Sequence, residues 1–342
     1  MQKYKRLEFA KHWDSAYIYL EICRMAEVLR VENIVKQYAG HTALNNISLA
    51  ANEGEVFGLL GPNGAGKTSL IRIINQITGP DSGKVFFKGR EISRDDVEHI
   101  GYLPEERGLY KKMKVREQVL YFAQLKGLSK QDAKRGIDEW FEKFEITSWF
   151  DKKVEELSKG MAQKIQFIIT VLHKPKLLIL DEPFSGFDPI NAQLITGEIL
   201  RLKQEGTSIM LSTHTMSSVE EICDSIALLN QSKLVLHGKL TAIKEQFRTH
   251  TYAVRFKGMM FGFANALWAG YSLENKEQID DERAVAYVKL LKGNTLNDLL
   301  AAVIPVVQIE SVNEVIPTMN DIFIRAVGGD TTGTIEKGGH GE

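Results

Sequence analysis

Short, fully apolar segments alternate with amphipathic ones along most of the chain. The segments 55–60 (EVFGLL), 176–183 (KLLILDEP) and 207–214 (TSIMLSTH) each adjoin turn residues, which predicts buried strands. Other strand-like segments are 28–38, 44–51, 83–92 and 100–104, with a hairpin expected at 225–238. Buried strands that alternate with helices are typical of a parallel sheet covered on both faces, so we expect an α/β fold.

Helical periodicity follows several of these strands. Behind the glycine-rich segment 61–68, one helix face collects the apolar residues Leu70, Ile71, Ile73, Ile74 and Ile77. The segment 113–173 is helical in pattern and highly charged, and a helical subdomain is expected over about 105–173. A further helix is predicted from Pro189 to Gln204, with Gly206 beyond its end as a stop signal.

The pattern of strand-like and helix-like segments changes after residue 245, and we expect a domain boundary there. Residues 28–244 form the main domain, and 245–328 predict a separate α+β domain of the order strand–helix–strand–strand–helix–strand. Residues 329–342 have the glycine and threonine content of a disordered tail. Residues 1–27 form an N-terminal extension. Its first 24 residues are either the result of a mis-assigned translation start, with Met25 as the true one, or an amphipathic arm.

Composition narrows the class of protein. The chain has 342 residues, 44% of them apolar, and a net charge of −1, which argues against a nucleic-acid partner because binding to a phosphate backbone needs a basic excess. The two cysteines, Cys23 and Cys223, lie far apart and predict ordinary reduced thiols. The longest uncharged run, 258–273, is too polar and too short for a bilayer span and predicts a buried helix. With no signal peptide pattern either, we expect a cytosolic protein that reaches a membrane only through a partner.

The segment 61–68, GPNGAGKT, fits the phosphate-binding pattern G-x-x-x-x-G-K-[ST] between a strand and a helix. Its glycines let backbone N–H groups turn toward phosphates, and the helix N-terminus adds positive potential. Lys67 can neutralise phosphate oxygens, and Thr68 can ligate Mg²⁺. The expected nucleotide-binding residues are Tyr38, Gly61, Pro62, Asn63, Gly64, Ala65, Gly66, Lys67, Thr68 and Ser69.

Carboxylates and a histidine stand at the ends of the later buried strands. Asp181 is expected to hold Mg²⁺, and Glu182 to act as the base that polarises the attacking water. His214 ends the neighbouring strand and would face the γ-phosphate. Tyr38 would stack on adenine. The N-K-x-D guanine reader of GTPases is missing, since NQSK at 230–233 fails the pattern, so ATP is the expected nucleotide.

Taken together, Tyr38, the 61–68 loop, LSKGM at 157–161, LLILDEP, SGFD at 185–188 and His214 resemble the motifs of the ATP-binding cassette (ABC) ATPases in order and spacing. The resemblance covers about residues 28–240. It implies a P-loop NTPase fold with an antiparallel β subdomain and a helical subdomain. The LSKGM variant and the C-terminal domain are similar to those of single-cassette ATPase subunits of bacterial drug- and sodium-efflux exporters.

The resemblance also implies a partner for the helix start at 157–164, LSKGMAQK. In ABC ATPases two cassettes form a head-to-tail dimer, here either a homodimer or a heterodimer, and this helix start contacts the γ-phosphate held by the other subunit. The residues implied are Ser158, Lys159, Gly160 and Met161. Ser158 and the N–H of Gly160 can donate to phosphate oxygens. Lys159 replaces the usual glycine, either as a tolerated variant with a favourable charge or pointing to solvent.

Three further expectations follow from the resemblance. Asp188 would lie at the dimer seam and couple the two sites. Glu105 stands where most relatives have glutamine and would ligate Mg²⁺, although a plain surface turn is the other reading. The helical segment 105–155 would dock a membrane permease, which places the protein on the cytoplasmic face of the membrane. The expected activity is ATP hydrolysis that drives transport, with export as the direction.

Two other classes of function remain to be weighed. A soluble cassette protein acting on ribosomes or DNA is the alternative, but such relatives carry two cassettes or a long coiled coil between the phosphate loop and the signature, and neither pattern is present. A binding module without hydrolysis would lack Lys67, Glu182 or His214, and all three are present.

Overall fold

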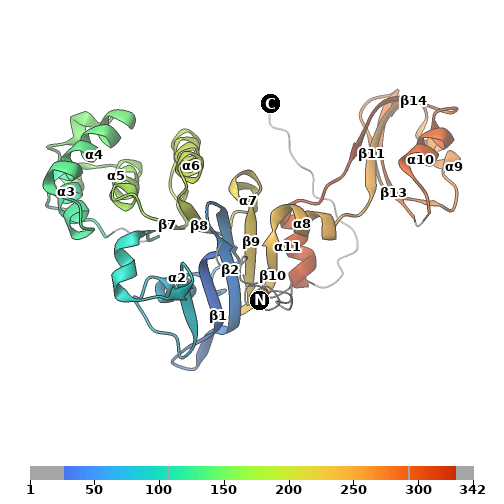
Figure 1. The fold of residues 1–342 in the computed structure, drawn as a ribbon. Coiled ribbons are helices and arrows are strands. Elements are labelled where there is room, and N and C mark those ends of the chain that lie inside the picture. Colours follow the sequence, from blue (N-terminus) through green and yellow to red (C-terminus); the bar gives the residue numbers. More distant parts are fainter. Residues whose placement is uncertain (1–26, 106–107, 292, 329–342) are drawn as a thin grey trace, which may run out of the picture. The chain divides into compact units, whose positions relative to one another are not determined.

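The computed structural model describes residues 27–105, 108–291 and 293–328 (Figure 1). The chain divides into two compact units, with the boundary between Leu240 and Thr241. The expected N-terminal extension with Met25, and the expected tail at 329–342, lie outside the described residues. Each unit has its own apolar core.

The first unit begins with an antiparallel sheet of the order β2-β1-β4-β5. Its strands are β1 (Glu27–Tyr38), β2 (His41–Asn52), β4 (Ser82–Phe87) and β5 (Arg90–Glu91). A two-residue turn joins β1 to β2, and both Ala39 and Gly40 have the positive φ that such a tight hairpin needs. Tyr38 pairs with His41 next to this turn.

A second sheet, of the order β10-β9-β3-β8-β7-β6, forms the centre of the first unit. Its strands are β3 (Val56–Leu60), β6 (Ile100–Leu103), β7 (Leu177–Asp181), β8 (Ser208–Thr213), β9 (Ser225–Asn230) and β10 (Lys233–Lys239). All neighbours pair in parallel except β9 and β10, which form the expected hairpin. Every residue of β3, β7 and β8 is buried, which agrees with the apolar centres of these strands; their buried polar residues, Asp181, Ser208, Ser212 and Thr213, lie at or next to strand ends.

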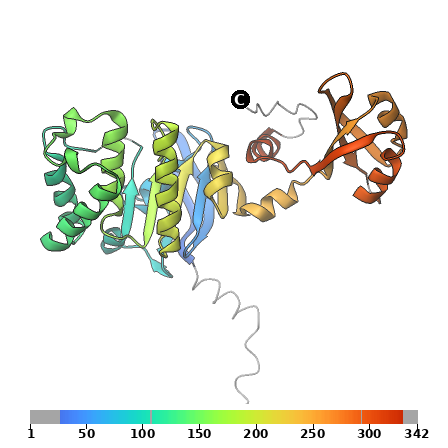
Figure 2. The same ribbon diagram turned by 90° about the horizontal axis from the view of Figure 1, so that it is seen from above.

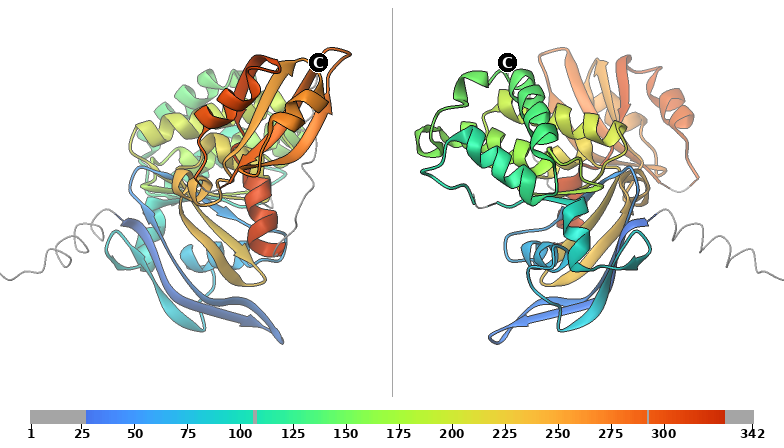
Figure 3. Two further views of the ribbon diagram at one scale, coloured as in Figure 1. Left: turned by 90° about the vertical axis from the view of Figure 1, so that its right-hand side faces the viewer. Right: turned by 60° about the vertical axis from the view of Figure 1, so that its left-hand side comes forward.

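Helices flank the parallel sheet. They are α2 (Lys67–Ile74), α3 (Val115–Leu125), α4 (Lys130–Lys143), α5 (Lys159–Val171), α6 (Pro189–Gln204) and α7 (Met216–Ile222), with 3₁₀ turns at Arg94–His99, Thr147–Trp149 and Val154–Glu156. α2 packs in one core with the antiparallel sheet and the parallel sheet, although Ile77 lies beyond its end and is exposed, contrary to prediction. α3, α4 and α5 group apart from the antiparallel sheet (Figure 3), and α6 runs along the parallel sheet (Figure 2).

The second unit is built on one antiparallel sheet of the order β12-β13-β11-β14. Its elements follow the predicted order: β11 (Thr251–Lys257), α9 (Met260–Ala266), β12 (Tyr271–Gln278), β13 (Arg283–Leu290), α10 (Leu296–Val303) and β14 (Gln308–Glu314). Two helices were not predicted, α8 (Leu240–Gln246) and α11 (Met319–Gly328). The core joins the sheet to α9 and α10, with the rings of Phe256 and Phe263 stacked at 4.5 Å.

The prediction of a buried helix over 258–273 is wrong. α9 has only seven residues, and of these only Phe263 is buried. Met259 is 78% exposed and Phe261 is 76% exposed, because the short helix packs one face on the sheet, with Met260 and Ala266 partly buried beside Phe263. Among the described residues, no helix has both the length and the apolar character needed to cross a bilayer.

Candidate nucleotide site

The strand order gathers the expected site residues at one edge of the parallel sheet. β3 leads into the glycine-rich loop, β7 ends at Asp181, β8 ends at Thr213, and β6 ends shortly before Glu105. These four strands are neighbours in the order β3-β8-β7-β6 and run parallel. Their carboxyl ends therefore share one edge, which is where open α/β sheets bind ligands.

The glycine-rich loop 61–68 is fixed at both ends and open in the middle. Gly61 (φ 146°) lies so close to the backbone that a Cβ would stand 2.2 Å from the carbonyl oxygen of Leu229. At Gly66 (φ 109°) a Cβ would stand 2.4 Å from the carbonyl oxygen of Ala43. Between them, residues 62–64 are exposed. The loop can thus present its N–H groups to a phosphate without rearranging its anchors.

Lys67 opens α2 and turns back over the loop. Its Nζ donates to the carbonyl oxygens of Gly61 at 2.7 Å and Pro62 at 3.2 Å. Burial lowers the pKa of Lys67, and the nearby carboxylates of Glu182 and Asp181 act in the opposite direction. The ammonium therefore occupies the mouth of the loop, where an incoming phosphate can replace the carbonyl oxygens as its partner.

Asp181 is the buried carboxylate of the site, with 2% exposure. The Thr68 hydroxyl donates to its Oδ2 at 3.3 Å, and the Ser212 hydroxyl donates to its Oδ1. Burial raises the pKa of Asp181, while the bonds from Ser212 and Thr68 favour the carboxylate. These three side chains come from α2, β7 and β8, so the parallel sheet itself sets their spacing.

Glu182 follows directly and points toward the next strand end. Its Oε1 lies 2.7 Å from Nδ1 of His214, and the Thr213 hydroxyl donates to its Oε2 at 3.3 Å. The backbone of Glu182 has φ +48°, a left-handed conformation that is disfavoured for a side chain of this size. Its N–H donates to the carbonyl oxygen of Ser212 at 3.0 Å, which holds this sharp turn against β8.

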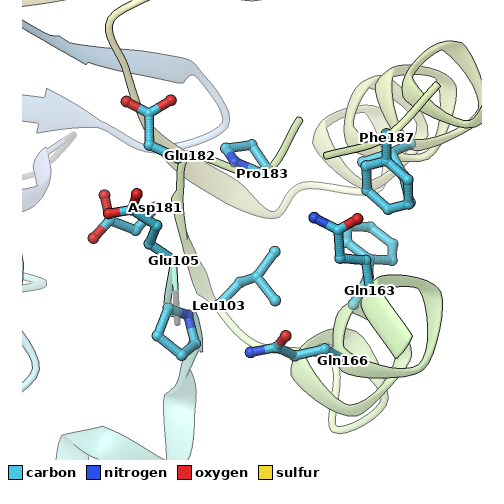
Figure 4. Close-up of a pocket in the computed structure, with 11 residues that line it drawn as sticks. Leu103, Glu105, Gln163, Gln166, Asp181, Glu182, Pro183 and Phe187 are labelled. Carbon is cyan, nitrogen blue, oxygen red and sulfur yellow. The ribbon is translucent and has the colours of Figure 1, made fainter. Parts of the chain in front are cut away.

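Glu105 reaches the same place from the end of β6. It lines a small cavity of about 20 Å³ together with Asp181, Glu182, Gln163 and Phe187. Figure 4 shows the three carboxylates on one side of the end of β7 and the two glutamines and Phe187 on the other. The cavity has room for roughly one water molecule and is far too small for a nucleotide.

The signature segment lies at the start of α5 and is exposed. Ser158 is the N-cap of α5, and its Oγ accepts from the N–H of Met161 at 3.3 Å. No atom outside the local chain comes within 4 Å of the position of a Cβ on Gly160. Asp188 caps α6 in the same way, and a hydrogen bond from the N–H of Asn191 lowers the pKa of Asp188. Among the described residues, no hydrogen bond joins the side chains of Ser158 or Asp188 to the phosphate loop.

Tyr38 comes to the phosphate loop through the β1–β2 hairpin. It pairs with His41, two residues before Ala43, and Ala43 abuts Gly66 of the loop. The ring is 41% exposed, with the Lys36 ammonium 5.4 Å from its centroid. An aromatic ring that is partly open to solvent thus lies on the hairpin whose second strand abuts the loop.

The sequence reasoning missed three polar residues that the structure places in the site. Ser212 and Thr213 hold Asp181 and Glu182, and the signal for them was their position at the end of a buried strand, just before His214. Gln163 of α5 donates to the carbonyl oxygen of Ser185 and lines the cavity. Nothing in the local sequence pattern pairs Gln163 with that loop.

Comparison with known proteins decides the family. The family model described as "ABC transporter" matches residues 44–185. The ABC transporter ATP-binding protein YhaQ of Bacillus subtilis (strain 168), itself uncharacterised, is 48% identical over 220 residues, which are 64% of this chain and 74% of that protein. The chain belongs to the ABC transporter ATP-binding proteins. The predicted family and the P-loop fold class are therefore confirmed.

Further relatives of this ABC protein extend the match. A second model, "ATP-binding protein DrrA1-3-like, C-terminal domain", matches residues 238–327. The linearmycin resistance ATP-binding protein LnrL of Bacillus subtilis (strain 168) is 34% identical over 217 residues, which are 63% of this chain and 70% of that protein. A solved ATP-binding subunit of an ABC transporter superposes with a TM-score of 0.61 at 29% identity, covering 64% of this chain and 93% of that one.

Membership of this family confirms the predicted class of function. The ABC protein is an ATP-binding transporter subunit with ATP hydrolase activity. The alternative of a cassette protein acting on ribosomes or DNA gains no support from these relatives.

Proposed function

We propose that Glu182 is the general base of ATP hydrolysis and that His214 holds it in position. A carboxylate can only accept hydrogen bonds, so Nδ1 of His214 carries the hydrogen in the 2.7 Å contact with Oε1. This contact fixes the ring and leaves Nε2, on a side chain that is 54% exposed, as the nitrogen that would meet a phosphate. This contact is the observation that carries the proposal, because it orients a carboxylate beside the phosphate loop.

The residues of the loop fit ATP and Mg²⁺. The N–H groups of residues 61–68 would surround the β-phosphate, with Lys67 opposite the γ-phosphate. Mg²⁺ prefers oxygen ligands and is commonly held by one or two carboxylates together with phosphate oxygens. Thr68, Asp181 and Glu105 offer such oxygens, and Ser212 orients Asp181 from behind. When bound, the metal ion would neutralise phosphate charge.

The second half of the site would come from another chain. Ser158 and Gly160 are exposed or open, and their helix N-terminus carries donors suited to a phosphate. In a head-to-tail dimer this surface would face the γ-phosphate on the partner's loop, and Asp188 would lie at the seam. A permease would bind the helical subdomain and anchor the pair at the cytoplasmic face of the membrane. The resistance function in the name of LnrL supports export as the direction.

Mixing two inactive chains tests the composite site. Lys67→Ala removes the phosphate partner of the loop, and Ser158→Arg blocks the signature with a bulky cation while leaving the loop intact. Each variant alone should be inactive. A mixture should regain ATPase activity, because one mixed dimer can assemble a single complete site. Mixed dimers should be verified with two affinity tags, and a verified mixed dimer with no activity above the parents would refute the head-to-tail site.

A further inference from the structure

The side chain of Lys159 lies across the loop 185–188 of its own chain. Gly186 has φ +81°, and a Cβ built on it would stand 2.5 Å from Cε, 2.7 Å from Nζ and 3.2 Å from Cδ of Lys159. The last three atoms of the lysine therefore pack on the Cα of Gly186. The positive φ favours glycine at this position, and the missing side chain leaves room for the end of Lys159 to lie directly on the backbone.

A second contact joins the same two segments. The side-chain amide of Gln163, one turn further along α5, donates to the carbonyl oxygen of Ser185. The Lys159 side chain makes no hydrogen bond or ion pair to any residue in the described ranges, so its contact with Gly186 is made by packing. The start of α5 and the loop 185–188 are thus held together twice, once by each side chain.

These contacts join two parts of the proposed site. α5 begins with Ser158 and Gly160, and the loop 185–188 ends with Asp188, the N-cap of α6. The loop also begins three residues after Glu182, so a shift of the loop would be expected to move the Glu182 carboxylate. In a head-to-tail dimer both segments would have to reach the partner together.

We propose that Lys159 is a positioning residue that locks the loop 185–188 to the start of α5 through its alkyl stem, so that the signature and Asp188 are presented as one rigid surface. The inference rests on the composite site proposed above. It differs from the reading of Lys159 as a phosphate ligand, because it requires the stem and not the charge. Met can supply the stem without the charge, and Arg can supply the charge with a different head group.

Hydrogen–deuterium exchange on the purified, nucleotide-free chain tests the contact without any need for a dimer. In Lys159→Ala, amides of 185–188 should exchange about fourfold faster, the effect of unpacking roughly one methylene group. Lys159→Met should exchange like the wild type. The matched control is Lys164→Ala, which removes the same charge from the same helix. Unchanged exchange in Lys159→Ala would refute the lock.

Turnover then tests whether the lock positions the site. Lys159→Ala should lower kcat about fivefold to tenfold with little change in the KM for ATP, since misplacement of a catalytic surface by a fraction of 1 Å has effects of this order. Lys159→Met should lose less than about twofold. If Met behaves like Ala while Arg behaves like the wild type, the charge matters and the proposal is wrong. Faster exchange with unchanged kcat would also overturn it.

The two proposals can fail separately. If the mixed-dimer test fails while the exchange results hold, Lys159 locks the loop but the head-to-tail site is wrong. If complementation succeeds and Lys159→Ala leaves exchange unchanged, the composite site stands without this lock.

Discussion

The two halves of the proposed site are built in opposite ways. In the phosphate-loop half, three charged side chains have partners within the chain: Lys67 donates to loop carbonyl oxygens, Asp181 accepts from Thr68 and Ser212, and Glu182 contacts His214. The signature half is exposed and open around Gly160. Side chains that are held by hydrogen bonds at the ends of buried strands keep their positions before a ligand arrives. An exposed helix start has backbone N–H groups without partners in the helix, so it can bind a group on a second protein surface.

The largest expected effect is the loss of turnover on substitution of Glu182, which distinguishes catalysis from nucleotide binding in the phosphate-loop half. Glu182→Gln keeps the shape of the side chain but removes the base, so kcat should fall by about 10² to 10⁴. ATP binding should persist, and binding of a fluorescent ATP analogue measures it. Lys67→Ala is the contrasting variant, because it should weaken nucleotide binding itself. Wild-type turnover in Glu182→Gln would exclude this carboxylate as the base.

Substitution of Glu105 tests whether the residue that follows β6 contributes a Mg²⁺ ligand to the phosphate-loop half. Glu105→Gln keeps an oxygen ligand but removes a charge, so it should retain activity and require more Mg²⁺ for the half-maximal rate. Glu105→Ala removes the ligand and should lose most turnover. Titrations of ATPase rate against Mg²⁺ measure both. Superimposable titrations for the wild type and Glu105→Gln would leave Glu105 as a surface turn residue.

In the signature half, loss of activity should not be matched by loss of stability. Ser158→Ala removes an N-cap with a long 3.3 Å bond, so unfolding should be easier by only about 0.5 kcal/mol. Turnover should fall about tenfold or more, because a donor to the transferred phosphate is lost. Ser158→Thr keeps the hydroxyl and serves as the control. A large drop in melting temperature with proportionate loss of activity would mean that Ser158 is only a helix cap.

The last expected effect concerns stability in acid and not turnover, and it involves the segment of chain that connects the two halves. His173 lies after α5, which begins with the signature, and before β7, which ends at Asp181. Burial lowers the pKa of His173 from 6.5 to about 4, and the neighbouring Lys126 cation adds to the shift. The unfolded chain therefore binds more protons than the native one between these values, and stability is lost as the pH falls through this window.

The corresponding experiment compares urea unfolding of the wild type and His173→Gln at two pH values. Between pH 7 and pH 5 the wild type should lose about 1–2 kcal/mol more than the variant, which has no titrating ring at this position. Equal losses in both proteins would show that the ring titrates alike in the folded and unfolded states.

Prediction from sequence succeeded where a single local pattern determines position. The apolar runs before the phosphate loop, Asp181 and His214 fixed these residues at the ends of buried parallel strands. It failed where position depends on neighbours distant in sequence. The contact of Lys159 with Gly186 joins the start of α5 to the loop 185–188, and no sequence periodicity predicts it. In α9 the apolar composition could not distinguish a core helix from one that exposes Phe261.

The left-handed backbone of Glu182 has a consequence for how this protein changes over evolutionary time. A glutamate in this conformation costs about 1–3 kcal/mol, a penalty that glycine would not incur and asparagine would incur less. Substitution by glycine or asparagine at this position is therefore expected to relieve backbone strain once catalysis is not required. In gene copies released from selection for ATP hydrolysis, position 182 should be among the first to drift, toward glycine or asparagine. A glutamate retained at this position would then indicate continued selection for ATP hydrolysis.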